Sequence, residues 1–318
     1  MSECILPLKF TVFTPTYNRA HTLGRVYESL CVQTYRSFQW LVVDDGSTDG
    51  TELLLSKLLR TAPFPIRVIR TENGGKHRAH NAAIKDAQSE LFVILDSDDE
   101  LTIDSLSILN GEWERIPNQF RCSFAGILGN SISSDKIMIG CDYAEDFVDG
   151  KLFELVSSGI LLGEKLPCYR TEVLRDYPFP ERLGCKALVP EGVVWSKISA
   201  KYQVRLINKN VRIYHKDSND PIALMNSYKR PDSNAWGSLQ YCVVVLNLAK
   251  DYWPRFFLVF VKSSINCTRF ALHSKSNVLS PLSQIENPLG RALWLTLFPA
   301  GIAFWFLDLI HMWIRRAR

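Results

Sequence analysis

The chain has 318 residues, of which 47% are hydrophobic and 22% are charged, so it encodes a globular protein with a sizeable core rather than a disordered one. This length fits one large domain or a domain with an appendage. A net charge of only +4 excludes a polycation that binds nucleic acid over its whole surface.

The eight cysteines stand alone, without a CxxC pair, which is typical of a reducing compartment rather than of a disulfide framework or a zinc site. The opening stretch MSECILPLKFTVFTPTYNR carries Glu3 and Lys9 and has no apolar core of the signal-peptide kind. We therefore expect the chain to begin folding in the cytoplasm.

Apolar runs alternate with helical patterns over roughly the first hundred residues. We predict strands at 10–15, 66–71 and 90–99 and at the start of the segment 39–51, with helices over 20–33, 52–59 and 77–87. This alternation predicts a parallel sheet wrapped by helices, in which ligands bind beyond the carboxyl ends of the strands. Four polar clusters follow these strands, namely TPTYNR, DDGSTD, NGGK and DSDD, and they predict a site at this edge.

Beyond about residue 100 the pattern becomes irregular, and we expect short strands and loops to about residue 225. Long helical stretches rich in aromatic residues are expected from Asn234 to His273, followed by the apolar segment 292–314.

The stretch LFVILDSDDELT, residues 91–102, leads from a buried strand directly into Asp96, Asp98 and Asp99. Carboxylates gathered after a strand suit Mg²⁺ or Mn²⁺, which prefer oxygen ligands and commonly bind substrate phosphates as well. The cation would offset the mutual repulsion of the aspartates. The alternative is a solvated acidic turn or the first turn of a helix, where acidic side chains are favourable.

A second acidic pair, Asp44 and Asp45, follows a strand in VVDDGSTDGT. Helix capping accounts for Ser47, Thr48 or Asp49, but it leaves the two adjacent carboxylates unexplained. The stretch TPTYNRA adds an aromatic ring beside a strand end, which is a plausible seat for a nucleobase.

The stretch from TVFTPTYNRA to DDGSTDGT, together with ENGGKHRAHNAAI and LDSDDELT, resembles the family 2 glycosyltransferases of the GT-A fold. The resemblance is close over about residues 8–110 and looser through 169–181 and 189–202. It implies an α/β fold, Rossmann-like, with a mixed, mostly parallel sheet flanked by helices. It also implies a catalytic domain over 1–225, with a nucleotide-sugar half at 8–110 and an acceptor half at 111–225, followed by a helical C-terminal region over 226–318.

The resemblance assigns roles to residues of these motifs. Asp44 would accept a hydrogen bond from the base, with Asp45 close by, and Lys76 is a natural partner for phosphate. The nucleotide-sugar-binding residues that it implies are Thr14, Pro15, Tyr17, Arg19, Asp44, Asp45, Gly74, Gly75, Lys76, Asp96 and Ser97. Asp98 would hold Mn²⁺ or Mg²⁺ on the diphosphate, with Asp99 as a second candidate ligand. His215 is a candidate third ligand or diphosphate contact, although a lone histidine is more often structural.

The family transfers a sugar from a nucleotide diphosphate with inversion, and an acceptor hydroxyl must lose its proton as it attacks. Glu191, in PEGVVW, stands where the family places an acid before a helix, and it is the candidate base. Many relatives have Glu-Asp here, whereas this chain has Glu-Gly. The alternative is a helix-start glutamate after Pro190, favourable by only ~0.3–1 kcal/mol.

The segment 292–314 is almost continuously apolar, and a bilayer crossing needs ~20 such residues. Pro299 and Asp308 argue against a simple span. Arginines stand at both ends, Arg291 before the segment and Arg315, Arg316 and Arg318 after it, so both ends favour the cytoplasmic face. We predict a kinked helix that lies in or dips into the inner leaflet. The alternative is a buried helix that packs on the catalytic domain or on a second subunit.

Together these features predict a metal-dependent inverting glycosyltransferase at the cytoplasmic side of the cell membrane. It would use a nucleotide-diphosphate donor, of UDP type, and a glycan or lipid-linked acceptor in surface polysaccharide or glycolipid assembly. One alternative is a nucleotidyltransferase, although TPTYNRAHT is not its Gly-rich basic loop. Another is a catalytically silent sugar-nucleotide-binding relative. The sequence identifies neither the sugar nor the oligomeric state.

Overall fold

The structure is a computed structural model that describes residues 8–182, 188–215 and 232–317, with side chains of the last helix as far as residue 314. Two compact units form: Met1–Glu181 with Lys201–Asp217, called the sheet unit below, and Arg182–Ala200 with Ser218–Arg318, called the helical unit. The predicted domain boundary at 225/226 lies outside the described residues, and so do Cys4, Cys185 and the side chains of the terminal arginines. The predicted division of the chain stays a prediction.

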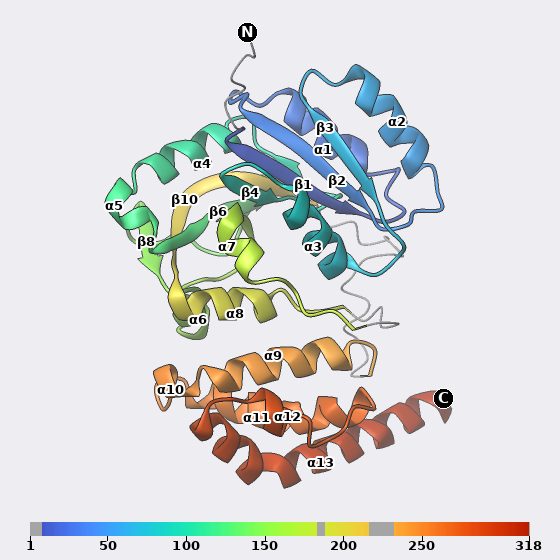
Figure 1. Cartoon of the computed structure of the whole chain (residues 1–318), viewed down its shortest axis with the longest axis vertical. Helices are drawn as coiled ribbons and strands as arrows, with labels where there is room; N and C mark the ends of the chain where they lie inside the picture. Colours follow the sequence, from blue (N-terminus) through green and yellow to red (C-terminus); the bar gives the residue numbers. More distant parts are fainter. Residues whose placement is uncertain (1–7, 183–187, 216–231, 318) are drawn as a thin grey trace. The chain divides into compact units, whose positions relative to one another are not determined.

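A ten-stranded mixed sheet forms the centre of the sheet unit, in the order β3-β2-β1-β4-β9-β6-β10-β5 (Figure 1). The short strands β7 and β8 pair with β6 and β10. Strands β3, β2, β1 and β4 are mutually parallel, whereas β9 runs antiparallel to both β4 and β6. The strands are β1 Phe10–Thr16, β2 Phe38–Asp44, β3 Ile66–Arg70, β4 Leu91–Ile94, β5 Glu100–Leu101, β6 Phe124–Ser133, β7 Met138–Ile139, β8 Phe147–Gly150, β9 Lys165–Arg170 and β10 Gln203–Tyr214.

Helices cover both faces of the sheet. One face packs against α1, α2 and α4 in a continuous apolar cluster that contains Trp40 and Trp113. On the other face α3 contacts β1 and β2, and the edge of the His80 ring meets Phe13 of β1. The helices of this unit are α1 Leu23–Cys31, α2 Thr51–Thr61, α3 Lys76–Asp86, α4 Ser105–Glu114, α5 Asn118–Arg121, α6 Leu152–Ser157 and α7 Thr171–Asp176.

These elements confirm the predicted fold class and the four strands and three helices expected over the first hundred residues. The expectation of only short strands beyond residue 100 is wrong, because β6 has 10 residues and β10 has 12. Two glycines in β6 interrupt the apolar pattern by which a strand is predicted, and the packing around both leaves no room for a side chain. A Cβ on Gly126 would lie 2.1 Å from the Cys168 carbonyl oxygen, and one on Gly129 would lie 2.2 Å from the Val211 side chain.

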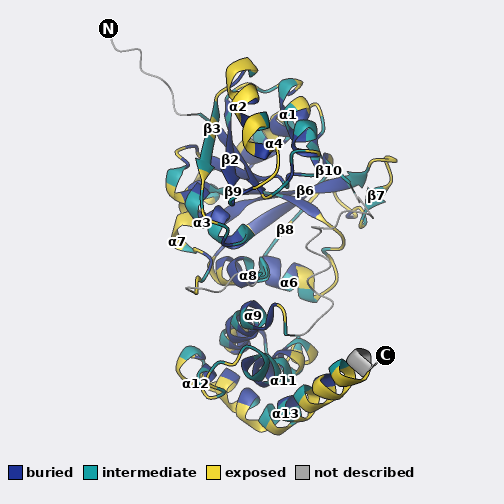
Figure 2. Ribbon diagram, turned by 90° about the vertical axis from the view of Figure 1, so that its right-hand side faces the viewer, coloured by how far each residue is buried: buried dark blue, intermediate teal, exposed yellow. Residues whose placement is uncertain are grey.

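The helical unit contains α8 Gly192–Lys201, α9 Ala235–Asn247, α10 Ala249–Tyr252, α11 Phe257–His273, α12 Pro281–Gln284 and α13 Pro288–Ala317. The long helices expected from Asn234 to His273 are therefore present. The stretch Pro288–Ile314 of α13 is long and apolar enough to cross a membrane, with 27 residues and a mean hydropathy of 1.8. Only 17% of its most apolar window is buried, so α13 is not an ordinary core helix (Figure 2).

Candidate functional site

The predicted motifs meet at one edge of the sheet. Strands β1, β2 and β4 are parallel, and β1 lies between the other two, so their carboxyl ends open on the same side. The chain leaves β1 toward β2 and β3 on one side and toward β4 on the other. Such a reversal of strand order creates a crevice beyond the carboxyl ends, which is where ligands bind in sheets of this kind.

Asp45 fixes the NGGK loop. Its two carboxylate oxygens each accept a backbone hydrogen bond, from Gly74 N at 2.8 Å and from Gly75 N at 2.8 Å. The side-chain amide of Asn73 donates to the Asp45 carbonyl oxygen at 3.1 Å. Gly75 has a φ of 95°, a left-handed conformation that glycine adopts without strain, and it directly precedes α3. The loop is thus preformed, with Lys76 as the first residue of the helix.

Asp44 is also turned into the protein. It is 1% exposed, its Oδ1 accepts a hydrogen bond from Ser47 N at 2.9 Å, and its Oδ2 lies 3.8 Å from Arg70 Nε. Asp44 therefore shapes the turn after β2, and its predicted contact with the base stays a prediction.

The residues after β1 differ in accessibility. Thr14 is fully buried, and its hydroxyl accepts a hydrogen bond from the Trp40 indole at 3.0 Å, so its side chain belongs to the core. Pro15 is buried too. Tyr17, directly after β1, is 36% exposed, whereas Arg19 is 7% exposed.

The acidic cluster after β4 is surrounded by cations. Lys76 Nζ lies 2.7 Å from Asp96 Oδ1, and Arg19 Nη2 lies 4.0 Å from Asp98 Oδ2. Burial raises the pKa of Asp96, but the charge and hydrogen bond of Lys76 outweigh it, and the net pKa is lowered. Ser97, between Asp96 and Asp98 in the sequence, is buried. The pairing of Lys76 with Asp96 joins the NGGK and DSDD motifs directly.

The carboxyl groups of Asp98 and Asp99 both have raised pKa values. Burial and the neighbouring charge of Asp96 raise the pKa of Asp98. Burial also raises the pKa of Asp99 to about 7, with Arg212 opposing the shift and the charges of Asp96 and Asp98 adding to it. A cation at this position would relieve the repulsion among these carboxylates.

The described residues contain no group of three or more His, Cys, Asp or Glu side chains arranged to hold a metal ion. Mn²⁺ and Mg²⁺ need no such cage, because they are commonly bound by one or two carboxylates together with substrate phosphates. Asp98, with 31% of its side chain exposed and a raised pKa, fits that donor set.

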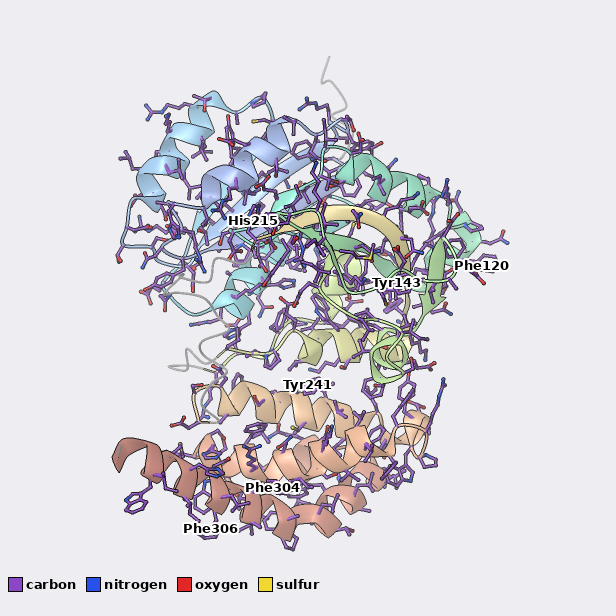
Figure 3. All side chains as sticks on the ribbon, turned by 180° about the vertical axis from the view of Figure 1, so that it is seen from behind. Phe120, Tyr143, His215, Tyr241, Phe304 and Phe306 are labelled. Atoms are coloured by element: carbon purple, nitrogen blue, oxygen red, sulfur yellow. The ribbon has the colours of Figure 1, made fainter. Side chains whose placement is uncertain are left out.

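Asp99 and His215 have other partners. Asp99 is 1% exposed, with Oδ2 at 3.3 Å from Arg212 Nη1 and Oδ1 accepting the backbone N–H of His215 at 3.1 Å. The His215 ring, at the end of β10, bonds to Glu100 Oε1 at 2.7 Å (Figure 3). These contacts favour a positioning role for both residues, and their predicted metal contacts stay predictions.

Sequence reasoning missed Arg212 and Asn73. Arg212 is 4% exposed, and besides Asp99 it donates from Nε to Ser131 Oγ at 2.9 Å. No motif marks Arg212, because its partners lie far away along the chain. Asn73 stands inside the quoted NGGK motif, and its amide could have been weighed as a loop anchor.

Glu191 belongs to the helical unit, directly before α8. Its Oε2 accepts a hydrogen bond from Trp195 Nε1 at 3.3 Å, and its carbonyl oxygen accepts the N–H groups of Val194 and Trp195. The helix start thus fixes the Glu191 backbone, and the indole donor orients its carboxylate. Its role as a base stays a prediction.

Comparison with known proteins agrees with this site. Residues 11–129 match the model of glycosyl transferase family 2. A poly(ribitol-phosphate) beta-N-acetylglucosaminyltransferase, TarS of Staphylococcus aureus, is 33% identical over 101 residues, which are 31% of this chain and 18% of that protein. The Escherichia coli protein WfgD, a UDP-Glc:alpha-D-GlcNAc-diphosphoundecaprenol beta-1,3-glucosyltransferase, is 30% identical over 40% of this chain and 52% of its own.

Solved structures share the fold. The crystal structure of TarS 1-349 in complex with UDP-GlcNAc matches with a TM-score of 0.58 and 19% identity, covering 91% of this chain and 79% of that chain. A mannosyltransferase from Pyrobaculum calidifontis, in complex with GDP-Man and Mn²⁺, matches with a TM-score of 0.51 and 16% identity, covering 95% and 86%.

The matched region contains all four motifs, including the acidic cluster DSDD. Residues 11–129 therefore form a domain of glycosyl transferase family 2, on a GT-A fold, as the motifs predicted. The chain spans only 29% and 32% of the length of two of its curated relatives, uncharacterized glycosyltransferases of Nostoc and Rickettsia felis.

Proposed function

We propose that the protein is a glycosyltransferase that moves a sugar from a nucleotide-diphosphate donor to an acceptor hydroxyl with inversion. The observation that carries this proposal is the convergence of DDGSTD, NGGK and DSDD at one sheet edge within a family 2 domain. Two direct contacts connect the motifs. The Asp45 carboxylate accepts hydrogen bonds from the Gly74 and Gly75 amides, and Lys76 forms an ion pair with Asp96.

Each of these groups has a task in donor binding. Asp45 holds the loop so that Gly75 and the start of α3 face the site, and a helix start favours an anionic ligand. Lys76 would exchange its contact with Asp96 for a phosphate oxygen when the donor binds. Mn²⁺ or Mg²⁺, held by Asp98 and the two phosphates, would supply the charge that stabilises the leaving diphosphate.

The transfer itself needs a base. Glu191 would accept the proton of the acceptor hydroxyl while its oxygen bonds to the anomeric carbon, and the nucleoside diphosphate departs from the opposite face. The hydrogen bond from Trp195 orients the carboxylate.

A UDP-type donor and a surface-polymer or lipid-linked acceptor are the substrate classes we propose. TarS was crystallised with UDP-GlcNAc, and WfgD is named for a UDP-sugar and a diphosphoundecaprenol acceptor. The apolar helix α13 supports a location at the membrane, and the arginines that flank its apolar segment favour the cytoplasmic side.

A donor panel tests this function. Purified full-length protein is incubated with UDP-glucose, UDP-GlcNAc and GDP-mannose in Mn²⁺, and the released nucleotide is identified by chromatography. Release of UDP in excess of a no-enzyme control supports the proposal. Pyrophosphate release would instead indicate a nucleotidyltransferase, and binding of UDP-sugars without turnover in the presence of acceptor lipid would indicate a silent relative.

A further inference from the structure

The inner face of helix α13 combines two glycines, one tryptophan and one aspartate, whereas its outer face is largely apolar. The side that packs into the helical unit bears Gly290, Trp294, Gly301 and Asp308, all buried and repeating at helical spacing. The Trp294 indole donates to the Thr268 hydroxyl at 2.9 Å. The apolar outer face distinguishes α13 from a helix in a water-soluble bundle, whose outer face is polar.

The helices α11 and α13 approach closely where small residues meet. A Cβ on Gly301 would lie 2.5 Å from Thr268 Cβ and 2.6 Å from the Ile265 carbonyl oxygen. Close contact through small and hydroxyl side chains is typical of helix pairs in a lipid environment, where burial of large apolar residues brings little gain.

Asp308 is the single acidic residue between Arg291 and Arg315, and it faces inward. Its carboxylate forms a two-pronged ion pair with Arg269 of α11, at 2.6 Å from Nε and 2.7 Å from Nη2. The ring of His273 bonds to the same carboxylate at 2.7 Å. The acidic residue that argued against membrane insertion is thereby satisfied within the helix pair.

The outer surface of the C-terminal half of α13 is apolar over a wide arc, in which His311, near one edge, is the one exposed polar residue among positions 303–314. At 100° per residue, the exposed apolar positions from 303 to 314 span roughly 220° of the helix circumference. Trp313 is 70% exposed and Phe306 is 54% exposed, and Figure 3 labels Phe304 and Phe306 on this helix. The exposed large apolar residues of this half are Phe304, Phe306, Leu307, Leu309, Ile310, Trp313 and Ile314.

An arc of this width fits lipid better than a protein partner. A second protein chain covers a stripe of a helix, whereas acyl chains conform to more than half of its circumference. The flanking arginines of the sequence, Arg291 and the three after Ile314, suit anionic headgroups at ~1 kcal/mol each.

The exposed half is too short to cross a bilayer. Pro299 lies inside α13, and Figure 2 shows the helix bent rather than straight. From Gly301 to Ile314 it is about 21 Å long at 1.5 Å per residue, against a hydrocarbon core of ~30 Å.

We propose that the C-terminal half of α13 lies within one leaflet of an anionic membrane, without crossing it, and that α11 holds it there through the Asp308–Arg269–His273 cluster. The occupant of the exposed face is the lipid bilayer. This refines the membrane location under the proposed function and is independent of sugar transfer.

Vesicle flotation tests the inference with the full chain and no donor or acceptor. Vesicles of phosphatidylcholine and phosphatidylglycerol, at 3:1, are mixed with the wild type, with the double variant Phe306→Glu/Ile310→Glu, and with the control Leu53→Glu. Leu53 is 76% exposed on α2 of the sheet unit, compared with 54% for Phe306 and 52% for Ile310, so the control adds a charge to an even more exposed apolar residue. The double variant should lose at least tenfold in the bound fraction, and the control should bind as the wild type does.

Depth and self-association are measured on the same proteins. Quenching of tryptophan fluorescence should be stronger with lipids brominated near the headgroup than with lipids brominated at the chain ends. Resistance to alkaline carbonate extraction, or equal vesicle binding by the double variant, would overturn the proposal. So would a wild-type dimer that the double variant converts to a monomer without any vesicle binding. Because no donor is present, none of these results bears on sugar transfer, which the donor panel tests separately.

Discussion

Asp45 illustrates how a single side chain can fix the conformation of a loop. Asp45 is 5% exposed. Its carboxylate accepts hydrogen bonds from the backbone amides of Gly74 and Gly75, which lie 29 and 30 positions further along the chain. A carboxylate that accepts backbone N–H groups forms stronger hydrogen bonds than a neutral acceptor does. The shape of the NGGK loop therefore depends on the charge of Asp45.

Replacing Asp45 with asparagine should weaken UDP binding in Mn²⁺ by roughly tenfold to a hundredfold, because one loop amide then faces an NH₂ group instead of an oxygen. Isothermal titration calorimetry measures the affinity. Asp135→Asn, at an exposed position, is the matched control and should bind UDP as the wild type does. Equal affinity in both variants would show that the loop does not depend on Asp45.

His77 predicts a pH dependence of stability. It is 2% exposed, its ring nitrogens have no hydrogen-bond partner in the described part of the chain, and burial lowers its pKa below 6.5. The folded state therefore binds fewer protons at this group than the unfolded state does. The free energy of unfolding should fall as the pH drops below about 6.5 and continue to fall until the lowered folded-state pKa is passed.

Urea denaturation of the wild type and His77→Gln, between pH 8 and pH 5, measures this effect. The variant loses some stability at every pH, so only the slopes are compared. The wild type should lose more stability than the variant on acidification. Parallel pH profiles would contradict the assignment.

Sequence motifs did not predict contacts between residues that lie far apart in the chain. The sequence placed Asp96, Asp98 and Lys76 at the site edge because each follows a strand or opens a helix. It could not reveal that Asp99 faces Arg212, since that pair joins β10 to the loop after β4 across more than a hundred residues. Local sequence patterns predict the strand end or helix start at which a residue lies, whereas tertiary packing determines which residues its side chain contacts.

Strands with strong apolar runs were predictable, and strands with special packing were not. The runs FTVFT and WLVV, within β1 and β2, are buried on both faces and have no interruption. Strand β6 carries Gly126 and Gly129 where neighbouring chain leaves no room for a side chain. Strand β10 carries polar residues at 208–210, where its pairing with β6 shifts register. Both features resemble loop signals in a sequence.

Two glycine substitutions test this explanation as a matched pair. Gly126→Ala should lower the free energy of unfolding by several kcal/mol, ~3 or more, because its Cβ would meet the Cys168 carbonyl oxygen at 2.1 Å. Gly111→Ala, inside α4 and with nothing within 4 Å of the added Cβ, should raise it by about 0.5–1 kcal/mol. Thermal unfolding followed by circular dichroism measures both. Equal changes in stability in the two variants would contradict the claim that β6 needs glycine at position 126 for steric reasons.

Considered as a whole molecule, the chain divides its tasks between two compact units. The sheet unit holds every predicted nucleotide-sugar residue, together with the acidic cluster and its cations. The helical unit holds Glu191 and the apolar helix α13. The proposed donor binding thus belongs to the part that matches the family model, while the proposed base and the proposed membrane contact belong to the part beyond residue 129.

The central claim is that the carboxylates beyond β4 bind a cation that in turn binds the donor diphosphate. Metal-dependent UDP release by Asp98→Asn, with the preferred UDP-sugar and increasing Mn²⁺, tests it most directly. A Lewis-acid cation stabilises the leaving group by several kcal/mol, so the variant should turn over about a hundredfold more slowly or worse, and added Mn²⁺ should not restore the rate. Full activity in Asp98→Asn, with the same Mn²⁺ dependence as the wild type, would contradict the account.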